Sequence, residues 1–142
     1  MMTKYNFSIS GNPVGKARHR DGKNGRKYTP AKTVEYQRRV LDIFHGHFGY
    51  PLPMRGPVCI FIEAIFEPPA SANKADRAAM LYGNIYPIKK PDWDNIGKII
   101  TDALNGEAYD DDKQIISAHV IKRYGRTAQV NVQIEDSNET LS

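Results

Sequence analysis

Two short groups of aspartates are the side chains of this sequence best suited to chemistry. Asp92 and Asp94 stand in the segment KPDWDN, and the run Asp110–Asp112 follows later. Side chains two positions apart in an extended segment project to the same side, so we expect Asp92 and Asp94 to face one way and Trp93 the other. Carboxylates roughly 4 to 7 Å apart repel each other by up to about 4 kcal/mol at an effective dielectric constant of about 20, and a divalent cation removes that cost. Such oxygen ligands favour Mg²⁺ or Mn²⁺ over zinc.

A purely structural role for the same aspartates stays open. One member of the pair would cap the helix that follows, and the other would interact with the helix dipole or with Lys98, four residues after Asp94. Three consecutive acids between a helix and a strand usually form a solvated turn. Spacing alone does not decide between metal binding and these structural roles.

Other metal sites fit the sequence poorly. An EF-hand loop beginning at Asp92 requires an oxygen ligand where Ile96 stands and a glutamate where Ala103 stands. A glycosyltransferase DxD site would need a sugar-nucleotide domain, and the chain has no glycine signature for one. The four histidines form no HExxH pattern. The chain has a single cysteine, Cys59, so an internal disulfide is excluded. Cys59 lies in an apolar run, which predicts a buried side chain.

The charge of the chain is divided between a basic and an acidic segment. Residues 1–40 carry ten lysines and arginines against two acids, a net charge of +8. Residues 92–112 carry seven acids against one lysine, a net charge of −6. An uncompensated basic segment attracts a polyanion, and the acidic segment would repel that polyanion unless cations lie between them. The two segments together indicate metal-dependent chemistry on nucleic acid.

The amino-terminal part of the chain predicts a strand, a basic loop and a helix. Residues 4–10 alternate apolar and polar side chains, as a half-buried strand does. Residues 11–30 are rich in glycine, proline and basic residues without apolar periodicity, which predicts a long basic loop. Apolar residues then recur at helical spacing, so we expect a helix over about 30–47, with Thr29 as its N-cap and Pro30 as its first residue.

The rest of the chain predicts a central strand, two helices and two final strands: 58–67, 71–81, 94–105, 114–124 and 128–135. The strand 58–67 is apolar on both faces, which is typical of the middle of a sheet. The helix 94–105 has the clearest amphipathic pattern, and Gly106 marks its end. We expect the last two strands to pair as a hairpin over 114–135, with its turn near Gly125.

These elements predict one domain over residues 1–142 of the α/β (α+β) class, with a mixed sheet of about four strands and helices packed on it. The chain of 142 residues is 40% apolar, which suits a single hydrophobic core. No apolar run approaches the roughly 20 residues of a membrane helix, and the amino end lacks the apolar core of a signal peptide. We therefore expect a cytoplasmic protein without membrane contact.

The segment KPDWDNIGKIITDALNGEAYDDDKQI resembles the core signature of the RusA family of Holliday-junction resolvases. In that signature a DxDN element opens a helix, a lysine follows, and DAL and DDxQ elements close the site. The upstream segments GNPVGKARHR and GRKYTPAKTVEYQ resemble the basic loop and first helix of the family. The resemblance covers most of residues 5–135 and implies a catalytic core over 90–116.

The resemblance implies a homodimeric, Mg²⁺-dependent endonuclease that nicks four-way DNA junctions symmetrically, with Mn²⁺ as a substitute ion. The metal-binding acids of the family fall on Asp92, Asp94 and Asp112, the second acid of DDxQ, and Asp111 beside it is a further candidate metal ligand. The essential lysine of the family falls on Lys98. The additional Asp110 makes a triple where the family pattern has a pair, so the metal-binding member of the run stays open.

The remaining site residues follow from charge and position. Lys98 would stabilise charge on the scissile phosphate, or would form only an ion pair on the helix surface, and Asp102 is expected to be its structural partner. Tyr28 and Trp93 are candidates for packing near the junction, with burial expected for Trp93. Six basic side chains are expected to contact backbone phosphates: Lys16, Arg18, Arg20, Arg26, Lys27 and Lys32.

Two other functions remain compatible with these features. One is a noncatalytic DNA-binding protein in which a metal ion serves only folding. The other is a metal-dependent RNase, because RNA presents the same phosphodiester chemistry.

Overall fold

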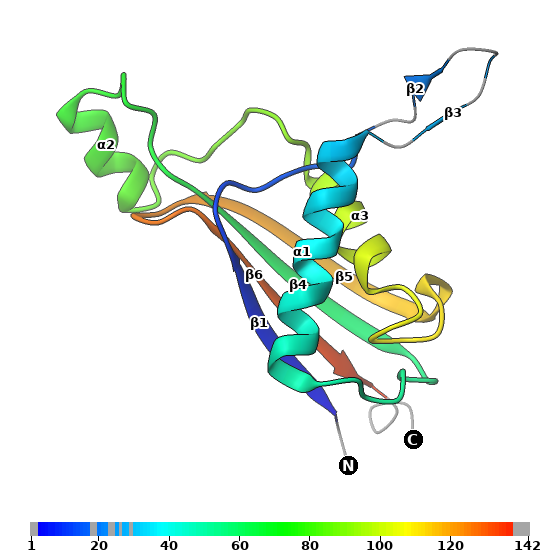
Figure 1. The fold of residues 1–142 in the computed structure, drawn as a ribbon. Helices are drawn as coiled ribbons and strands as arrows, with labels where there is room; N and C mark the ends of the chain where they lie inside the picture. The colour runs from blue at the N-terminus through cyan, green and yellow to red at the C-terminus, as the bar shows by residue number, and fades with distance from the viewer. Residues whose placement is uncertain (1–2, 18–19, 23–24, 26, 29, 138–142) are drawn as a thin grey trace.

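The computed structural model describes residues 3–17, 20–22, 25, 27–28 and 30–137, and Figure 1 shows their arrangement. Its main sheet contains β1 (Lys4–Ser10), β4 (Val58–Phe66), β5 (Ile115–Tyr124) and β6 (Gln129–Asp136) in the order β1-β6-β4-β5. β4 runs parallel to β5 and antiparallel to β6. The predicted mixed sheet of about four strands is therefore confirmed, within a single α+β domain.

The predicted C-terminal hairpin over 114–135 is wrong. β4 lies between β5 and β6, so these consecutive strands flank a common neighbour and do not pair with each other. The connection passes the end of β4, where the backbone N–H of Gly125 donates to the carbonyl of Phe66 at 2.9 Å. The ladders that β4 forms with β5 and β6 override the local turn signal near Gly125.

Two helices pack on one face of the sheet and form the core with it. In Figure 1, α1 (Ala31–Phe48) and α3 (Trp93–Leu104) lie on the same side of the sheet. The ring of Phe44 on α1 contacts Tyr5 and Phe7 of β1, with centroids 5.1 and 5.8 Å apart. The apolar stripe of α3 is buried at Ile96, Ile99, Ile100, Ala103 and Leu104.

The face of the sheet opposite α1 and α3 is less buried than the apolar sequence of β4 predicts. Burial along β4 nearly alternates, with Phe61 exposed and Cys59 only partly buried. The central position of this strand is confirmed, but its apolar composition does not reflect burial on both faces. The expectation that Cys59 is a buried side chain is likewise only partly met.

The helix boundaries differ from the predicted ones by a few residues. Pro30 is the N-cap of α1, so the helix begins one residue later than predicted, and Thr29 lies outside the described residues. The short α2 (Lys74–Leu81) begins after Asn73, whose side chain accepts from the backbone N–H of Asp76 at 2.8 Å. The predicted basic loop contains a small two-stranded sheet of β2 (Arg20–Asp21) and β3 (Lys27–Tyr28). No helix of the described residues is long and apolar enough to cross a membrane.

Gly125 makes the close turn beyond β4 possible. A Cβ atom at this position would lie 2.5 Å from Cγ2 of the buried Ile65. We predict that Gly125→Ala lowers the free energy of unfolding by about 1 to 3 kcal/mol, because Ile65 has no room to yield. The measurement is urea denaturation followed by circular dichroism.

The matched control is Gly46→Ala in α1, where an added Cβ meets no atom within 4 Å. Alanine should raise stability there by about 0.5 to 1 kcal/mol, because glycine is unfavourable within a helix. Equal effects of the two alanine substitutions would contradict the close packing of Gly125.

Candidate active site

Asp92 and Asp94 lie at the start of α3. Asp92 is the N-cap, with an extended backbone (φ −69°, ψ 153°), but its side chain makes no capping hydrogen bond. Asp94 lies in the first helical turn. The prediction that residues 92–94 form an extended run is wrong, because the helix begins at Trp93. Both carboxylates are exposed and available to a ligand, and capping does not account for Asp92.

The two carboxylates nevertheless face a common space. A hollow of about 500 Å³ is lined by Asp92, Asp94 and Trp93 and by three lysines, Lys89, Lys90 and Lys122. Trp93 is 64% exposed, so the expectation of burial for this side chain is wrong. The apolar face of α3 is filled by isoleucines, and Trp93 stands outside that stripe.

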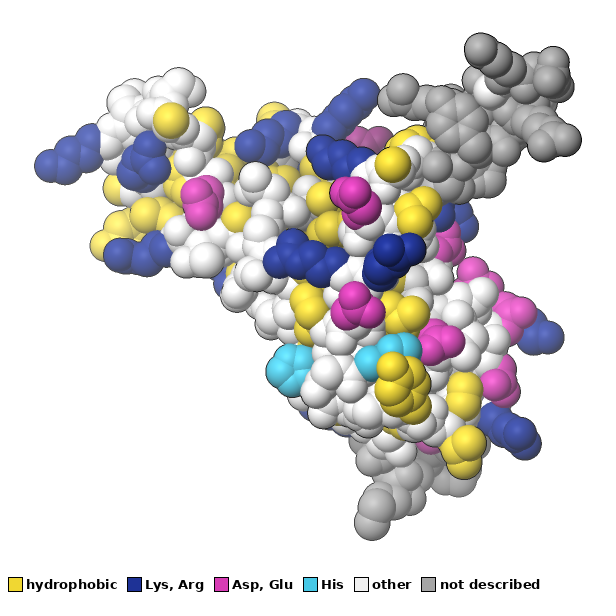
Figure 2. Space-filling model, in the orientation of Figure 1, with side chains coloured by type: hydrophobic (Ala, Val, Ile, Leu, Met, Phe, Trp, Pro, Cys, Tyr) yellow, Lys and Arg dark blue, Asp and Glu magenta, His cyan; other side chains and the backbone are white. Residues whose placement is uncertain are grey.

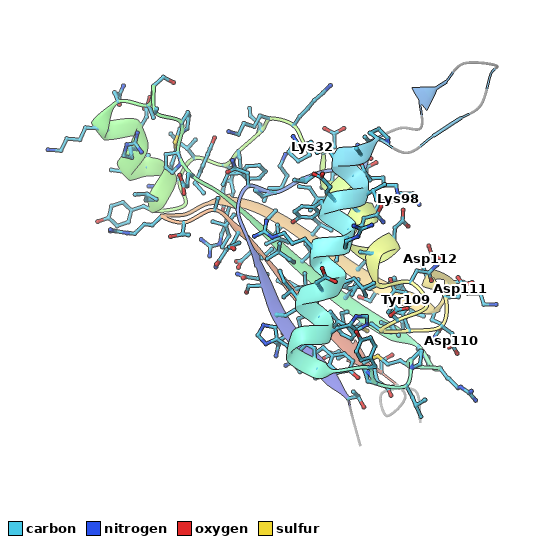
Figure 3. The ribbon with its side chains drawn as sticks, viewed as in Figure 1. Lys32, Lys98, Tyr109, Asp110, Asp111 and Asp112 are labelled. Atoms are coloured by element: carbon cyan, nitrogen blue, oxygen red, sulfur yellow. The ribbon has the colours of Figure 1, made fainter. Side chains whose placement is uncertain are left out.

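The three consecutive acids Asp110–Asp112 occupy three different environments. Asp110 lies 3.9 Å from Nε of Arg55 in an exposed ion pair. Asp111 caps the short 3₁₀ helix Asp112–Gln114, accepting from the backbone N–H of Lys113 at 3.0 Å. Asp112 has Lys98 and Asp102 of α3 among its charged neighbours. Figure 3 shows Lys98 and the three acids on the same side of the molecule.

Gln114 fixes the acidic turn to the rest of the fold. Its side-chain oxygen accepts from the backbone N–H of Asp111 at 2.7 Å, which completes a capping box. Its amide donates to the carbonyls of Met54 and Gly56 at 2.8 and 2.9 Å. The glutamine of the DDxQ pattern therefore ties the turn to the segment that enters β4.

The neighbouring carboxyls of Asp111 and Asp112 affect each other's protonation. The backbone N–H of Lys113 and a hydrogen bond with Asp112 hold the pKa of Asp111 below its ordinary value. The same hydrogen bond, loss of hydration and the negative charge of Asp111 raise the pKa of Asp112, and Lys98 opposes this rise. The pair therefore retains a proton on the Asp112 side more readily than an isolated aspartate would.

A charge cluster on α3 connects this turn to the basic loop. Asp102 lies 3.1 Å from Nζ of Lys16 and 3.7 Å from Nζ of Lys98. The expected pairing of Lys98 with Asp102 is thus observed, although the Lys98 side chain is 60% exposed. Lys16 also donates to Gln37 at 3.2 Å and, through its backbone N–H, to Asn95 at 2.9 Å. These contacts hold the beginning of the basic loop against α3.

Tyr109 is a site residue that the sequence reasoning missed. Its buried hydroxyl donates to the carbonyl of Thr101 at 2.6 Å, which links the acidic turn to α3. Burial raises its pKa, and the charges of Asp112, Asp102 and Asp111 raise it further. The sequence signal that could have identified Tyr109 is its position directly before the acidic run.

The predicted phosphate-binding residues are distributed unevenly. Lys16 and Lys32 line a second hollow of about 680 Å³ together with Asp92 and Lys90. A Cβ at Gly15 would lie 2.7 Å from Cβ of Pro91, so the loop passes very close to the start of α3. The other predicted basic residues lie farther along the loop, with Arg20 and Lys27 in β2 and β3, and Arg18 and Arg26 outside the described residues.

The predicted metal ligands do not form one compact cluster. Among the residues that the structure describes, no group of three or more His, Cys, Asp or Glu side chains is arranged to hold a metal ion. Asp92 and Asp94 share a hollow at the start of α3, and Asp112 lies beside Lys98 and Asp102 farther along that helix. The candidate donors are all carboxylate oxygens, which fit a hard divalent cation.

Exposed carboxylates beside lysines and a basic loop are compatible with a protein that acts on phosphodiesters. Residues 10–135 match the family described as Endodeoxyribonuclease RusA, and the chain belongs to this family of endonucleases. The chain is also 30% identical over 135 residues to the uncharacterized protein YqaN of Bacillus subtilis (strain 168). The similarity covers 92% of this chain and 94% of that protein.

The unequal environments of Asp111 and Asp112 make a testable pH prediction. As the pH falls, Asp112 should take up a proton before Asp111, with a midpoint above the ordinary aspartate value. As the pH rises through this range, ionisation of Asp112 lowers the free energy of unfolding. The ionised Asp111 instead raises the free energy of unfolding, and this contribution is lost as the pH falls through its lowered pKa. Asp111→Asn should lower the titration midpoint of Asp112, because the variant removes the negative charge of Asp111 and its amide would donate to the ionised Asp112. Carboxyl ¹³C NMR measures this midpoint.

The matched control is Asp76→Asn on the exposed surface of α2, which should leave the midpoint of Asp112 unchanged. An Asp112 midpoint that does not respond to Asp111→Asn would disprove the coupling.

Proposed function

We propose that this protein is a Mg²⁺-dependent endonuclease that resolves four-way DNA junctions by paired phosphodiester hydrolysis, acting as a cytoplasmic homodimer. The main support is the electrostatic environment of Asp112: Asp110 lies beside Arg55 and Asp111 caps the 3₁₀ helix, whereas Asp112 has Lys98 and Asp102 of α3 among its charged neighbours. The hydrogen bond from Tyr109 to the carbonyl of Thr101 holds the DDxQ turn against the helix that the DxDN element opens. Two subunits are needed because symmetric nicks require two active sites about the two-fold axis of a junction.

Asp92 and Asp94 at the start of α3, and Asp112 farther along that helix, are the proposed ligands of divalent cations, with Mn²⁺ as a substitute for Mg²⁺, although the three carboxylates do not form one compact cluster in the structure. When bound there, the divalent cation would lower the pKa of an attacking water and stabilise charge on the leaving oxygen. Asp111 remains engaged in capping and acts on Asp112 through their hydrogen bond. Asp110 is exposed beside Arg55, and we assign it no role in metal binding.

The basic residues have two proposed tasks. Lys16 holds the loop against α3 through Asp102 and Gln37, and its partial burial limits its contact with DNA. Lys32 lines the same hollow as Asp92, which supports its proposed contact with a backbone phosphate. Sequence alone assigns the same phosphate-binding role to Arg18, Arg20, Arg26 and Lys27.

The assay for this function compares a synthetic four-way junction, its arm duplex and a hairpin RNA, each with and without Mg²⁺. We expect paired nicks in the junction alone, and only with the cation. Retarded but intact junctions would indicate a noncatalytic DNA-binding protein, and cleavage of the hairpin alone would indicate an RNase.

Asp94→Asn should abolish junction cleavage and leave junction binding equal or stronger. The amide weakens metal binding and also removes a negative charge that repels phosphate. Asp112→Asn should behave in the same way, whereas Asp110→Asn should cleave at the wild-type rate. Single-turnover cleavage and gel retardation measure the two effects. If Asp110→Asn were inactive and Asp112→Asn active, the assignment within the acidic run would be wrong.

Lys98→Ala should lower the cleavage rate about 10² to 10³-fold with much less effect on junction binding, because Lys98 would stabilise charge that develops on the phosphate. Lys98→Arg should restore activity only in part, because a planar guanidinium does not reproduce a point-charge contact. Saturating enzyme and a synthetic junction give the rate. An alanine variant within about threefold of wild type would leave Lys98 only its surface ion pair with Asp102.

A further inference from the structure

The segment that connects α2 to α3 exposes large apolar side chains beside the candidate active site. Trp93 is 64% exposed and Ile88 is 96% exposed. Both line the 500 Å³ hollow that also contains Asp92 and Asp94. Exposed apolar side chains grouped at a concave surface mark an interaction site. The size of the hollow lies within the range of small-ligand pockets, roughly 300 to 1,000 Å³.

Three lysines line this hollow, and contacts with the fold hold two of them, Lys89 and Lys122. Nζ of Lys89 and Nζ of Lys122 lie 5.5 and 5.7 Å from the centroid of the same ring, that of Phe66. Lys122 also donates to the backbone carbonyl of Lys89. Figure 2 shows lysine and arginine side chains along the upper edge of the molecule, over the segment between α2 and α3. With Lys90, the lysines outnumber the two aspartates of the hollow.

The composition of the hollow favours a nucleobase with its flanking phosphates over a second copy of this chain. A two-fold contact between two such hollows would bring equal sets of lysines together, which is unfavourable. An apolar ring beside fixed lysines is instead the combination that binds single-stranded nucleic acid, through base stacking and phosphate contacts.

We propose that Trp93 stacks on a base that has left the helical stack at the branch point of the junction, with Ile88 as the opposite apolar wall. Lys89, Lys90 and Lys122 contact the phosphates on either side of that base. This proposal rests on the proposed junction-resolving function. An unstacked base costs least where the helix is already interrupted, so the contact distinguishes a junction from a continuous duplex.

Trp93 is also the single tryptophan of the chain and therefore reports directly on its own environment. The first measurement is its fluorescence during titration with a four-way junction in EDTA, where no cleavage occurs. We expect saturable quenching by the junction and little quenching by the arm duplex at equal protein occupancy. Equal quenching by both DNAs would overturn the proposal.

The second measurement is the affinity for a junction that carries 2-aminopurine at the branch point, read from the change in 2-aminopurine fluorescence on binding. Trp93→Ala should weaken junction binding about 5- to 100-fold and change duplex binding less than about twofold, with Trp93→Phe in between. Tyr82→Ala is the matched control, because Tyr82 is an 84% exposed aromatic outside this hollow. It should bind both DNAs as the wild type does.

The outcomes separate this proposal from the proposed function. If the wild-type protein neither binds nor cuts junctions, both fall. If the wild type cuts junctions and Trp93→Ala retains full junction affinity, only the stacking proposal falls. Light scattering adds a third arm, because loss of an oligomer in Trp93→Ala would make the residue a subunit contact and overturn the stacking proposal.

Discussion

Burial of the apolar stripe of α3 is the constraint on which the candidate site depends. Ile96, Ile99 and Ile100 are buried against the sheet, so the helix cannot rotate without exposing them. Burying each such side chain stabilises the fold by about 1.5 to 3 kcal/mol. The same packing leaves Asp94 and Lys98, four residues apart, exposed on the remaining surface of the helix. The exposed charged side chains of the helix are therefore positioned by its buried apolar residues.

Segments distant in sequence reach α3 through a few specific contacts. Asp102 accepts Lys16 from the basic loop, and the carbonyl of Thr101 accepts the hydroxyl of Tyr109 from the acidic turn. Gln114 ties that turn to the entrance of β4. Tyr109 is buried, so loss of its hydroxyl would leave the carbonyl of Thr101 without that partner. Lys16 and Asp102 are also largely buried, so both the acidic turn and the basic loop are anchored to α3 by contacts that are poorly exposed to solvent.

Sequence reasoning succeeded where one local pattern decides the outcome and failed where distant segments compete. The period of the isoleucines predicted α3 to within one residue at each end, and the apolar run predicted β4 as a central strand. The hairpin failed because the turn signal near Gly125 is local, whereas the insertion of β4 between β5 and β6 depends on the whole sheet. Burial was expected for Trp93 because of its size, but it stands outside the apolar stripe of α3. Spacing also could not separate Asp110, Asp111 and Asp112, because their differences arise from Arg55, from backbone capping and from Lys98.

The placement of the lysines would allow the proposed acidic site to bind a polyanion. Asp92 and Lys90 line both hollows, which therefore adjoin at the start of α3. Lys32 belongs to one hollow and Lys122 to the other. A nucleic-acid strand lying across both hollows would meet a lysine before and after it passes Asp92, and these charges offset the repulsion between carboxylate and phosphate. The offset is local, since charges separated by more than about 10 Å are screened at 0.1 M salt. The lysines nearest the carboxylates therefore matter more for this balance than the larger number of basic residues farther along the loop.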